Sequence, residues 1–532
     1  MQDKVMIVGG GTMGAGIAFV SAAGGYRAEV VEPDGAARAR ARARWEKDAQ
    51  RAGDPTIVER IAFLNEIPQQ SDAAIAIEAV PERFDLKRDV LQKLERALPP
   101  EALLATNTSS LAVGELADTV ERPQRVVGIH FFNPPVAMKL VEVIAAEATS
   151  AEALASAHAF VERIGKTGVD AADTPGFIVN RVARPFYLQS MRALDLGVAP
   201  VPELDALARA AGFRMGPFEL MDLIGLDVNF ATSVSVYERL EAERLTPLEM
   251  QREMVAQGRL GRKTGEGFYS YAEGDPERLD LRVEPMPEDE TNLEEVVCVI
   301  GFGDVADHMI ELLQEHFANV VPIASDEMLD ELPADATLVI DVGDGQSDRS
   351  AMIATLDSML GRDTVIFVDA YATDVSNATK RMRHAERLVG YGILGALESQ
   401  DAVEIVDAET VSDDALALAQ ELFEALGKGV ALVENVPGLY LGRVIGSIVN
   451  EAVIAVQEDV ASADDIDTAM RLGVNYPQGP IAWGREIGGR RLTRILQRIA
   501  DAEGEAFAPH RALWVLDVQQ EEEEHEELDA RA

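Results

Sequence analysis

The chain has 532 residues, 92 acidic and 48 basic, and a net charge of −44, which makes nucleic acid and anionic membrane surfaces poor partners. The length suggests several domains, and no apolar run is long enough to span a membrane. The N-terminus leads directly into a predicted strand, so we expect no signal peptide. Cys298 is the single cysteine and cannot form an internal disulfide, which favours a reducing, cytoplasmic setting. Only nine basic residues are Lys, and we hypothesise that this composition reflects a high-salt cytoplasm.

The first predicted strand, residues 4–8, leads into a glycine-rich turn and a helix-like segment at 15–23. The turn consists of Gly9, Gly10, Gly11, Thr12, Met13 and Gly14. In this context Gly9 permits a tight turn, Gly11 lets the backbone approach a pyrophosphate, and Gly14 allows close helix–strand packing. The second strand is followed by Glu32, whose carboxylate would accept hydrogen bonds from a ribose and repel a 2′-phosphate. These features predict a dinucleotide site that prefers NAD to NADP.

Residues 1–172 alternate apolar strands with helices, as a parallel α/β sheet requires. The predicted strands are 5–8, 28–31, 74–78, 103–106, 126–131 and 140–144. Between the second and third strands we predict a helical excursion over 36–64. It carries Arg38, Arg40, Arg42 and Arg44, which form either a solvated face or a basic surface for the phosphates of a nucleotide-bearing substrate.

His130 and Glu142 lie in the last two of these strands, which a Pro-containing turn joins. A hairpin would place the two side chains opposite each other. Glu142 shares its face with Leu140 and Ile144, where an unpaired carboxylate would be costly, so it needs a partner. A carboxylate on one imidazole nitrogen raises the basicity of the other, and this suits removal of a hydroxyl proton. A satisfied core histidine is the structural alternative.

Residues 173–272 are predicted to be helical, and residues 273–293 are predicted to form an acidic, Pro-containing linker. The remainder repeats the first part in degraded form. Glu404 repeats Glu142 at an offset of 262, whereas Gly301 repeats Gly9 at an offset of 292. The second copy has therefore lost about 30 residues, and the helical excursion is the obvious candidate.

Several motifs in the first copy resemble the (S)-3-hydroxyacyl-CoA dehydrogenase family, and the resemblance covers residues 1–272 almost completely. The motifs are Thr106–Ser110, His130–Pro134, Asp173–Arg181, Met215–Leu220 and Gly261–Tyr269. The tandem arrangement, with Asn475–Pro480 in the second copy, resembles the long bacterial type that acts on 3-hydroxybutyryl-CoA or 3-hydroxyadipyl-CoA, including enzymes of phenylacetate breakdown. Fatty acid β-oxidation is the broader metabolic setting that the resemblance implies.

The resemblance implies a role for each matching residue. His130 would be the base and Glu142 its orienting carboxylate, while Ser109 and Asn180 would hydrogen-bond the reacting oxygen. It implies further cofactor-side residues, at Glu82, Lys87, Asn107, Ser109, Asn133 and Lys263, and no metal. Ser109, Asn180 and Asn133 could instead be turn or capping residues, and Lys87 and Lys263 ordinary surface cations.

The second copy departs from this pattern. Ser109, His130 and Asn180 correspond to Tyr371, Gly392 and Gly442. We therefore predict a Rossmann-like NAD-binding domain followed by an all-α domain, with both repeated in degenerate form. The predicted domain bounds are 1–172, 173–272, a linker at 273–293, a catalytically dead 294–408, a second helical domain at 409–520, and an acidic tail at 521–532.

The resulting prediction is NAD-dependent oxidation of short-chain (3S)-3-hydroxyacyl-CoA to 3-oxoacyl-CoA. The alternatives are a dehydrogenase of the same fold that acts on a non-CoA hydroxy acid, and a non-catalytic NAD-binding protein. In single-copy relatives the helical domain forms the dimer interface. We therefore expect residues 409–520 to pack against 173–272 as an internal pseudo-dimer, which leaves room for a further homo-oligomer.

Overall fold

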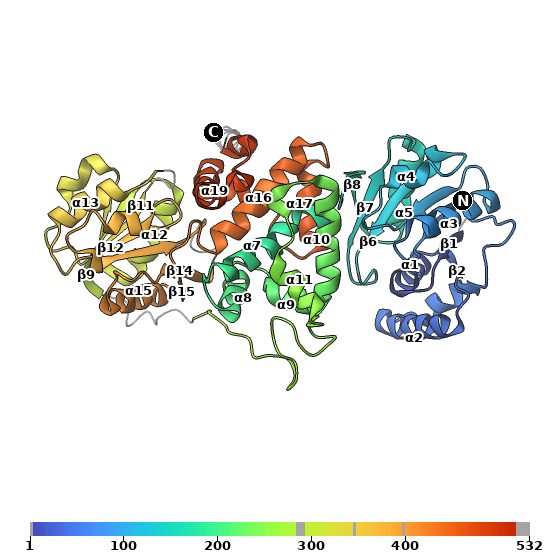
Figure 1. Cartoon of the computed structure of the whole chain (residues 1–532), viewed down its shortest axis with the longest axis horizontal. Helices are drawn as coiled ribbons and strands as arrows, with labels where there is room; N and C mark the ends of the chain where they lie inside the picture. Colours follow the sequence, from blue (N-terminus) through green and yellow to red (C-terminus); the bar gives the residue numbers. More distant parts are fainter. Residues whose placement is uncertain (1–3, 284–292, 344–346, 396–399, 518–532) are drawn as a thin grey trace. The chain divides into compact units, whose positions relative to one another are not determined.

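The computed structural model describes residues 4–283, 293–343, 347–395 and 400–517, and the chain folds into two compact units. The first unit contains the residues up to Val182 together with 238–240 and 455–479. The second contains 183–237, 241–454 and the residues from Pro480 onward. Each unit holds one mostly parallel sheet, coloured blue to teal in the first and yellow to orange in the second (Figure 1). Part of the predicted linker and the predicted acidic tail lie outside the described residues.

The first sheet has eight strands in the order β3-β2-β1-β4-β5-β6-β7-β8, and only the β6–β7 pair is antiparallel. The strands are β1 (Lys4–Val8), β2 (Arg27–Val31), β3 (Ile61–Leu64), β4 (Ile75–Glu78), β5 (Leu103–Thr106), β6 (Val126–Phe131), β7 (Leu140–Ala145) and β8 (Thr167–Ala172). The helices are α1 (Thr12–Ala23), α2 (Gly35–Ala52), α3 (Phe84–Ala97), α4 (Val113–Ala117), α5 (Ala151–Arg163) and α6 (Val179–Val182).

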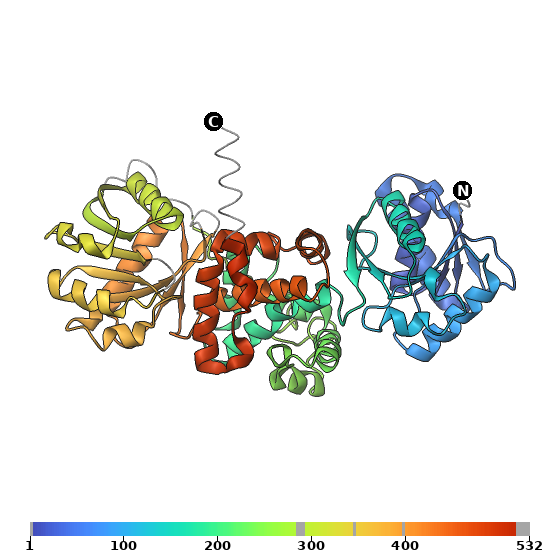
Figure 2. The ribbon, with the colours of Figure 1, turned by 90° about the horizontal axis from the view of Figure 1, so that it is seen from above.

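Helices lie on both faces of this sheet (Figure 2), so its central strands are buried along their whole length. α1, α2 and α5 share one core with the strands, in which Trp45 is fully buried and donates from its indole to the carbonyl of Ala15. From β1 the chain passes through α1 to β2 and then to β3, toward one edge of the sheet. From β4 it passes to β5 and the later strands, toward the opposite edge. The sheet therefore has a switch point between β1 and β4, where such folds bind ligands.

The predicted helical excursion over 36–64 is wrong in its second half. α2 ends at Ala52, and Gly53 follows with a φ of 71°, which favours glycine. A short 3-10 helix (Pro55–Arg60) then leads into β3, which pairs in parallel with β2. A four-residue apolar run such as Ile61–Leu64 has too little periodicity to separate helix from strand, so the neighbouring strand decides its conformation. β8 was likewise not predicted.

The helical segments that follow the two sheets contribute most of their helices to the second unit. Those of the first copy are α7 (Arg184–Asp195), α8 (Val201–Ala210), α9 (Pro217–Ile224), α10 (Leu226–Leu240) and α11 (Glu249–Ala256). Those of the second copy are α16 (Leu441–Gln457), α18 (Pro480–Ile487) and α19 (Gly489–Glu503), whereas α17 (Ala463–Gly473) belongs to the first unit. As predicted, no strand lies between residues 173 and 272, where only isolated bridges occur. Among the described helices, none combines the length and apolarity needed to cross a bilayer.

The second sheet repeats the first with one strand fewer, in the order β10-β9-β11-β12-β13-β14-β15. Its strands are β9 (Leu293–Gly301), β10 (Phe317–Ile323), β11 (Leu338–Gly343), β12 (Val365–Asp369), β13 (Leu388–Gly392), β14 (Ala402–Val406) and β15 (Gly429–Val433). Its helices are α12 (Asp304–His316), α13 (Ser350–Met359), α14 (Val375–Thr379) and α15 (Asp413–Ala425). Only a 3-10 helix (Asp326–Glu331) separates β10 from β11. The counterparts of α2 and β3 are therefore the segment that this copy lacks.

Candidate active site

The glycine turn has the geometry that its sequence predicts. Gly9 has a φ of 109°, and a Cβ atom there would lie 2.5 Å from the carbonyl oxygen of Ala79. A Cβ at Gly14 would lie 1.9 Å from the carbonyl oxygen of Gly9, so helix α1 can approach β1 only with glycine at this position. At Gly11 no atom would lie within 4 Å of an added Cβ. The turn thus leaves open space beside the N-terminus of α1, where Thr12 and Met13 begin the helix and a pyrophosphate fits.

Glu32 lies directly against this turn. Its carboxylate accepts hydrogen bonds of 2.9 Å from the backbone amides of Gly10 and Asp34. It therefore stands at the carboxyl end of β2, where the ribose of a dinucleotide is held in such folds. These residues fit NAD, and the cofactor preference that we predict depends on this carboxylate.

Arg38 and Arg44, two of the five arginines of α2, donate hydrogen bonds to backbone carbonyls outside the helix. Arg38 donates to the carbonyls of Glu32 and Leu64, at 2.5 and 2.9 Å, and so joins the ends of β2 and β3. Arg44 reaches the carbonyl of Thr12 at 3.3 Å. Arg38 is partly buried, whereas Arg40, Arg42 and Arg44 are exposed. The helix therefore contacts the strand ends through Arg38 and the glycine turn through Arg44.

His130 and Glu142 meet as predicted, on the antiparallel pair β6 and β7. The two residues are direct partners in the strand register, and Nδ1 of His130 lies 2.6 Å from Oε2 of Glu142. Glu142 is fully buried, and its Oε1 accepts from the backbone amides of Ile178 (3.1 Å) and Val179 (2.9 Å). Both carboxylate oxygens of Glu142 therefore have hydrogen-bond partners, and these partners offset the cost of burying the group in the core. In the described part of the chain the imidazole forms no other hydrogen bond, so Nε2 has no protein partner there.

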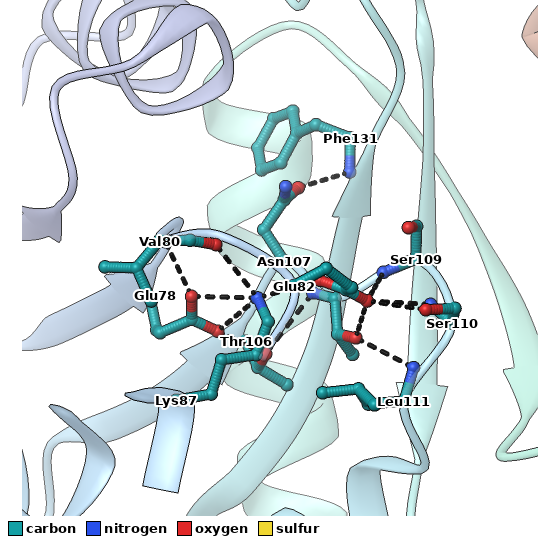
Figure 3. A network of polar contacts seen from close by, with 11 residues as sticks. Glu78, Val80, Glu82, Lys87, Thr106, Asn107, Ser109, Ser110, Leu111 and Phe131 are labelled. Carbon is teal, nitrogen blue, oxygen red and sulfur yellow. Dashed lines mark hydrogen bonds and ion pairs between the residues drawn. The ribbon is translucent and has the colours of Figure 1, made fainter. Parts of the chain in front are cut away.

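Ser109 lies on a loop after β5 that Glu82 organises (Figure 3). Oε1 of Glu82 accepts from the backbone amides of Ser109 and Ser110, both at 3.0 Å, and from the hydroxyl of Thr108 at 2.5 Å. Burial alone would raise the pKa of Glu82, but the charge of Lys87 and the hydrogen bonds from Thr108, Lys87 and Ser110 lower it to about 2. Glu82 is therefore an anion that shapes the loop. The Ser109 side chain is exposed, and its hydroxyl has no partner among the described residues.

Lys87 is buried, so the alternative of an ordinary surface cation is wrong. Its ammonium forms ion pairs with Glu78 (2.9 Å) and Glu82 (3.1 Å), and Glu78 also accepts from the hydroxyl of Thr106 at 2.7 Å (Figure 3). Sequence reasoning missed Glu78, although a carboxylate at the end of an apolar strand calls for a partner. Lys87 thus ties the ends of β4 and β5 together through Glu78.

The remaining predicted residues lie in different places. Asn107 accepts from the backbone amide of Phe131 at 2.9 Å and so joins β5 to β6, and Asn133 is exposed beside a cis Pro134. Asn180 is on α6, next to Val179, and belongs to the same unit as the histidine. Lys263 lies in the second unit, where it forms an ion pair with Asp227. Their roles toward cofactor and substrate stay predictions.

The corresponding region of the second copy is filled by Tyr371, which is fully buried and donates from its hydroxyl to Glu404. A Cβ at Gly392 would lie 3.0 Å from Cζ of the tyrosine, and one at Gly442 would lie 2.7 Å from its Cε1. The ring thus occupies the space that the counterparts of His130 and Asn180 would need. Glu404 keeps its backbone partners, the amides of Tyr440 (2.7 Å) and Leu441 (3.2 Å).

The nucleotide crevice of the second copy is also altered. Phe302 stands in the middle of the turn, and its side chain is 68% exposed. Arg349 pairs with Asp341 at 2.9 Å and with Asp326, which follows β10, at 2.6 Å. The guanidinium links the carboxyl ends of β10 and β11, the region that corresponds to the cofactor side of the first sheet.

The fold and the site together define a dinucleotide-dependent dehydrogenase: a glycine turn at a helix N-terminus, a carboxylate at the carboxyl end of β2 and a buried His–Glu pair belong to one sheet. The sequence comparisons then specify the family. The model described as the NAD-binding domain of 3-hydroxyacyl-CoA dehydrogenase matches residues 4–174, and the model of the C-terminal domain matches 176–271 and again 438–525. The chain belongs to the 3-hydroxyacyl-CoA dehydrogenase family, and its cofactor is NAD.

The individual relatives support the tandem arrangement. The chain is 34% identical over 515 residues to the 3-hydroxyadipyl-CoA dehydrogenase of Escherichia coli strain K12, and the match covers 94% of each chain. The crystal structure of the 3-hydroxybutyryl-CoA dehydrogenase from E. coli K12 superposes with a TM-score of 0.78 at 31% identity and covers 98% of this chain and 99% of that one. The 3-hydroxybutyryl-CoA dehydrogenase of Mycobacterium tuberculosis is 36% identical and matches 51% of this chain and 98% of its own length.

Proposed function

We propose that the chain oxidises short-chain (3S)-3-hydroxyacyl-CoA to 3-oxoacyl-CoA with NAD, and that the first copy alone carries the chemistry. The observation that carries this proposal is the buried contact of 2.6 Å between His130 and Glu142 in the same sheet as an intact dinucleotide turn. The acyl groups that the relatives' names give, hydroxybutyryl and hydroxyadipyl, support a short chain.

The proposed mechanism follows from the contacts of the imidazole. Because Nδ1 donates to Glu142, the Nε2 lone pair is the base that accepts the proton of the 3-hydroxyl group. Glu142 holds the ring in this tautomer and stabilises the imidazolium that results. The Ser109 hydroxyl and the Asn180 amide donate to the oxygen that becomes the carbonyl. NAD, when bound at the turn, supplies the acceptor for the hydride from C3.

The test is the reverse reaction, the reduction of acetoacetyl-CoA, followed by loss of NADH absorbance. We expect rapid consumption of NADH and little consumption of NADPH, because the Glu32 carboxylate repels a 2′-phosphate. The assay is run at low and high salt, since screening of a chain with a net charge of −44 affects both its stability and its encounter with an anionic substrate. An enzyme that binds NADH yet leaves acetoacetyl-CoA unchanged at every salt concentration would contradict the proposal.

We further infer that the two helical domains stand in for the two subunits of a dimer. Within the second unit, Arg244 pairs with the buried Glu451 at 2.6 Å, and the hydroxyls of Ser190 and Tyr440 lie 3.1 Å apart. These contacts between the two helical segments support an internal pseudo-dimer, and for a single chain of this kind we expect a mass near 57.5 kDa by light scattering. A stable dimer in solution would show that a second interface exists. We also propose a cytoplasmic location, supported by the buried, unpaired thiol of Cys298.

A further inference from the structure

The second copy contributes a segment to the unit that holds the active site. Residues 455–479, which include α17, belong to the first unit. The backbone amide of Ala172, at the end of β8, donates to the carbonyl of Val460 at 2.8 Å. Arg181 on α6 is 1% exposed and forms an ion pair of 2.7 Å with Glu458. The segment is therefore fixed to the sheet edge by a backbone hydrogen bond and by an ion pair in which the arginine is buried and the carboxylate is half exposed.

Gly473, the last residue of α17, lies where this segment touches the catalytic strands. A Cβ atom at this position would lie 2.6 Å from Cδ2 of Leu140, 3.1 Å from Cγ2 of Val179 and 3.7 Å from Cζ of Phe132. Leu140 and Val179 are almost completely buried, so neither can move aside freely. Glycine is thus the residue that lets the helix approach so closely.

The three residues around Gly473 are each linked to the His130–Glu142 pair, by a backbone hydrogen bond, a ring contact or a shared strand face. The backbone amide of Val179 donates to Oε1 of Glu142 at 2.9 Å. The ring of Phe132 packs on the imidazole of His130 with centroids 4.7 Å apart. Leu140 lies two residues before Glu142 on β7, so both side chains are on the same face of the sheet. A shift at Gly473 therefore reaches both members of the pair.

We propose that Gly473 is a positioning residue for the dehydrogenase reaction, and that the catalytically altered second copy serves the first by bracing its His–Glu pair with α17. This inference rests on the proposed function, because it assigns α17 a role in that same site. It also explains in physical terms why the chain contains a second copy that lacks the catalytic base. The helical part of that copy completes the packing around the base of the first copy.

The test is Gly473→Ala in the full-length chain, with two readouts. We expect kcat for acetoacetyl-CoA reduction to fall roughly 10- to 100-fold, because displacements of about 1 Å in a catalytic group have effects of this size. The Kd for NADH should stay within about twofold, since the glycine turn is untouched. In ¹⁵N-histidine-labelled protein, the imidazole resonances of His130 should shift. Adding Leu140→Val, which removes the nearest atom, should restore most of the activity and the original resonances.

The matched control is Gly446→Ala, in α16 of the same copy, where the nearest atom to a new Cβ would be 3.6 Å away. We expect it to leave turnover and the His130 resonances unchanged. Wild-type turnover and unchanged resonances in Gly473→Ala would overturn the inference, as would a loss of activity explained entirely by a smaller folded fraction. If the wild type itself does not reduce acetoacetyl-CoA, the proposed function fails, and the resonances of the two variants still decide the role of Gly473.

Discussion

Replacing His130 with alanine is expected to lower turnover by roughly 10²- to 10⁴-fold, the range that general-base catalysis contributes. Under the proposed mechanism the Nε2 lone pair of His130 accepts the hydroxyl proton while Glu142 holds Nδ1 at 2.6 Å. The dinucleotide turn does not depend on it, so NADH binding should survive. Steady-state reduction of acetoacetyl-CoA and NADH fluorescence titration measure the two effects separately.

The chain offers a matched control on the same domain. His158 also lies 12 residues before a carboxylate partner, Asp170, at 2.7 Å, but this pair is exposed. His158→Ala should therefore leave turnover near that of the wild type. If His130→Ala abolished NADH binding instead of turnover, the histidine would be a structural residue, as the core-histidine alternative holds.

Glu142→Gln is expected to reduce both turnover and stability. The carboxylate accepts from an imidazole on one oxygen and from two backbone amides on the other. A glutamine offers one oxygen and one NH₂ group. With its oxygen on the backbone amides, the NH₂ group faces Nδ1 of His130. It then either meets the proton on Nδ1, which leaves a buried donor unsatisfied, or favours the tautomer that is protonated at Nε2, which removes the base. We expect turnover to fall roughly 10²-fold or more, and the free energy of unfolding to fall by about 1–3 kcal/mol, the penalty for an unsatisfied buried polar group. Urea unfolding followed by circular dichroism gives the second value.

Glu404→Gln is the control for this variant, because Glu404 has the equivalent backbone contacts in the second copy but a tyrosine in place of the histidine. It should leave turnover unchanged. A loss of turnover as large as that of Glu142→Gln would show that the second copy takes part in catalysis.

The stability of Glu404→Gln should depend on pH in a defined direction. Burial raises the pKa of Glu404 from 4.5 to about 7, so the folded state binds this proton more tightly than the unfolded state. This group's contribution to wild-type stability is therefore greatest below about pH 4.5 and declines as the pH rises to about 7. Glutamine does not titrate. As the pH rises over this interval, the free energy of unfolding of the variant should therefore increase relative to that of the wild type, by up to roughly 3 kcal/mol. Unfolding measured at pH 5 and pH 8 tests the sign.

The parts of the site that depend on local pattern could be predicted from the sequence. The glycines at 9, 11 and 14 take the places that their spacing requires, because each is dictated by backbone geometry within one strand–turn–helix unit. The pairing of His130 with Glu142 followed from the alternation of side chains along two adjacent strands joined by a short turn. β5 and β6 have the predicted limits, since buried strands of a parallel sheet read as short apolar runs. The family followed from ordered motifs, and the comparisons confirm it.

The features that depend on partners distant in the chain became visible only in the folded structure. Ile61–Leu64 is a strand because β2 lies beside it, and Lys87 is buried because Glu78 and Glu82 converge on it. The contact of Gly473 with Leu140 joins residues more than 300 positions apart, and no local periodicity encodes it. Such contacts arise from the packing of complementary surfaces, whose shapes depend on the whole fold. That is why the sequence could locate the catalytic pair in the first copy, whereas the structure was needed to show which part of the second copy lies against it.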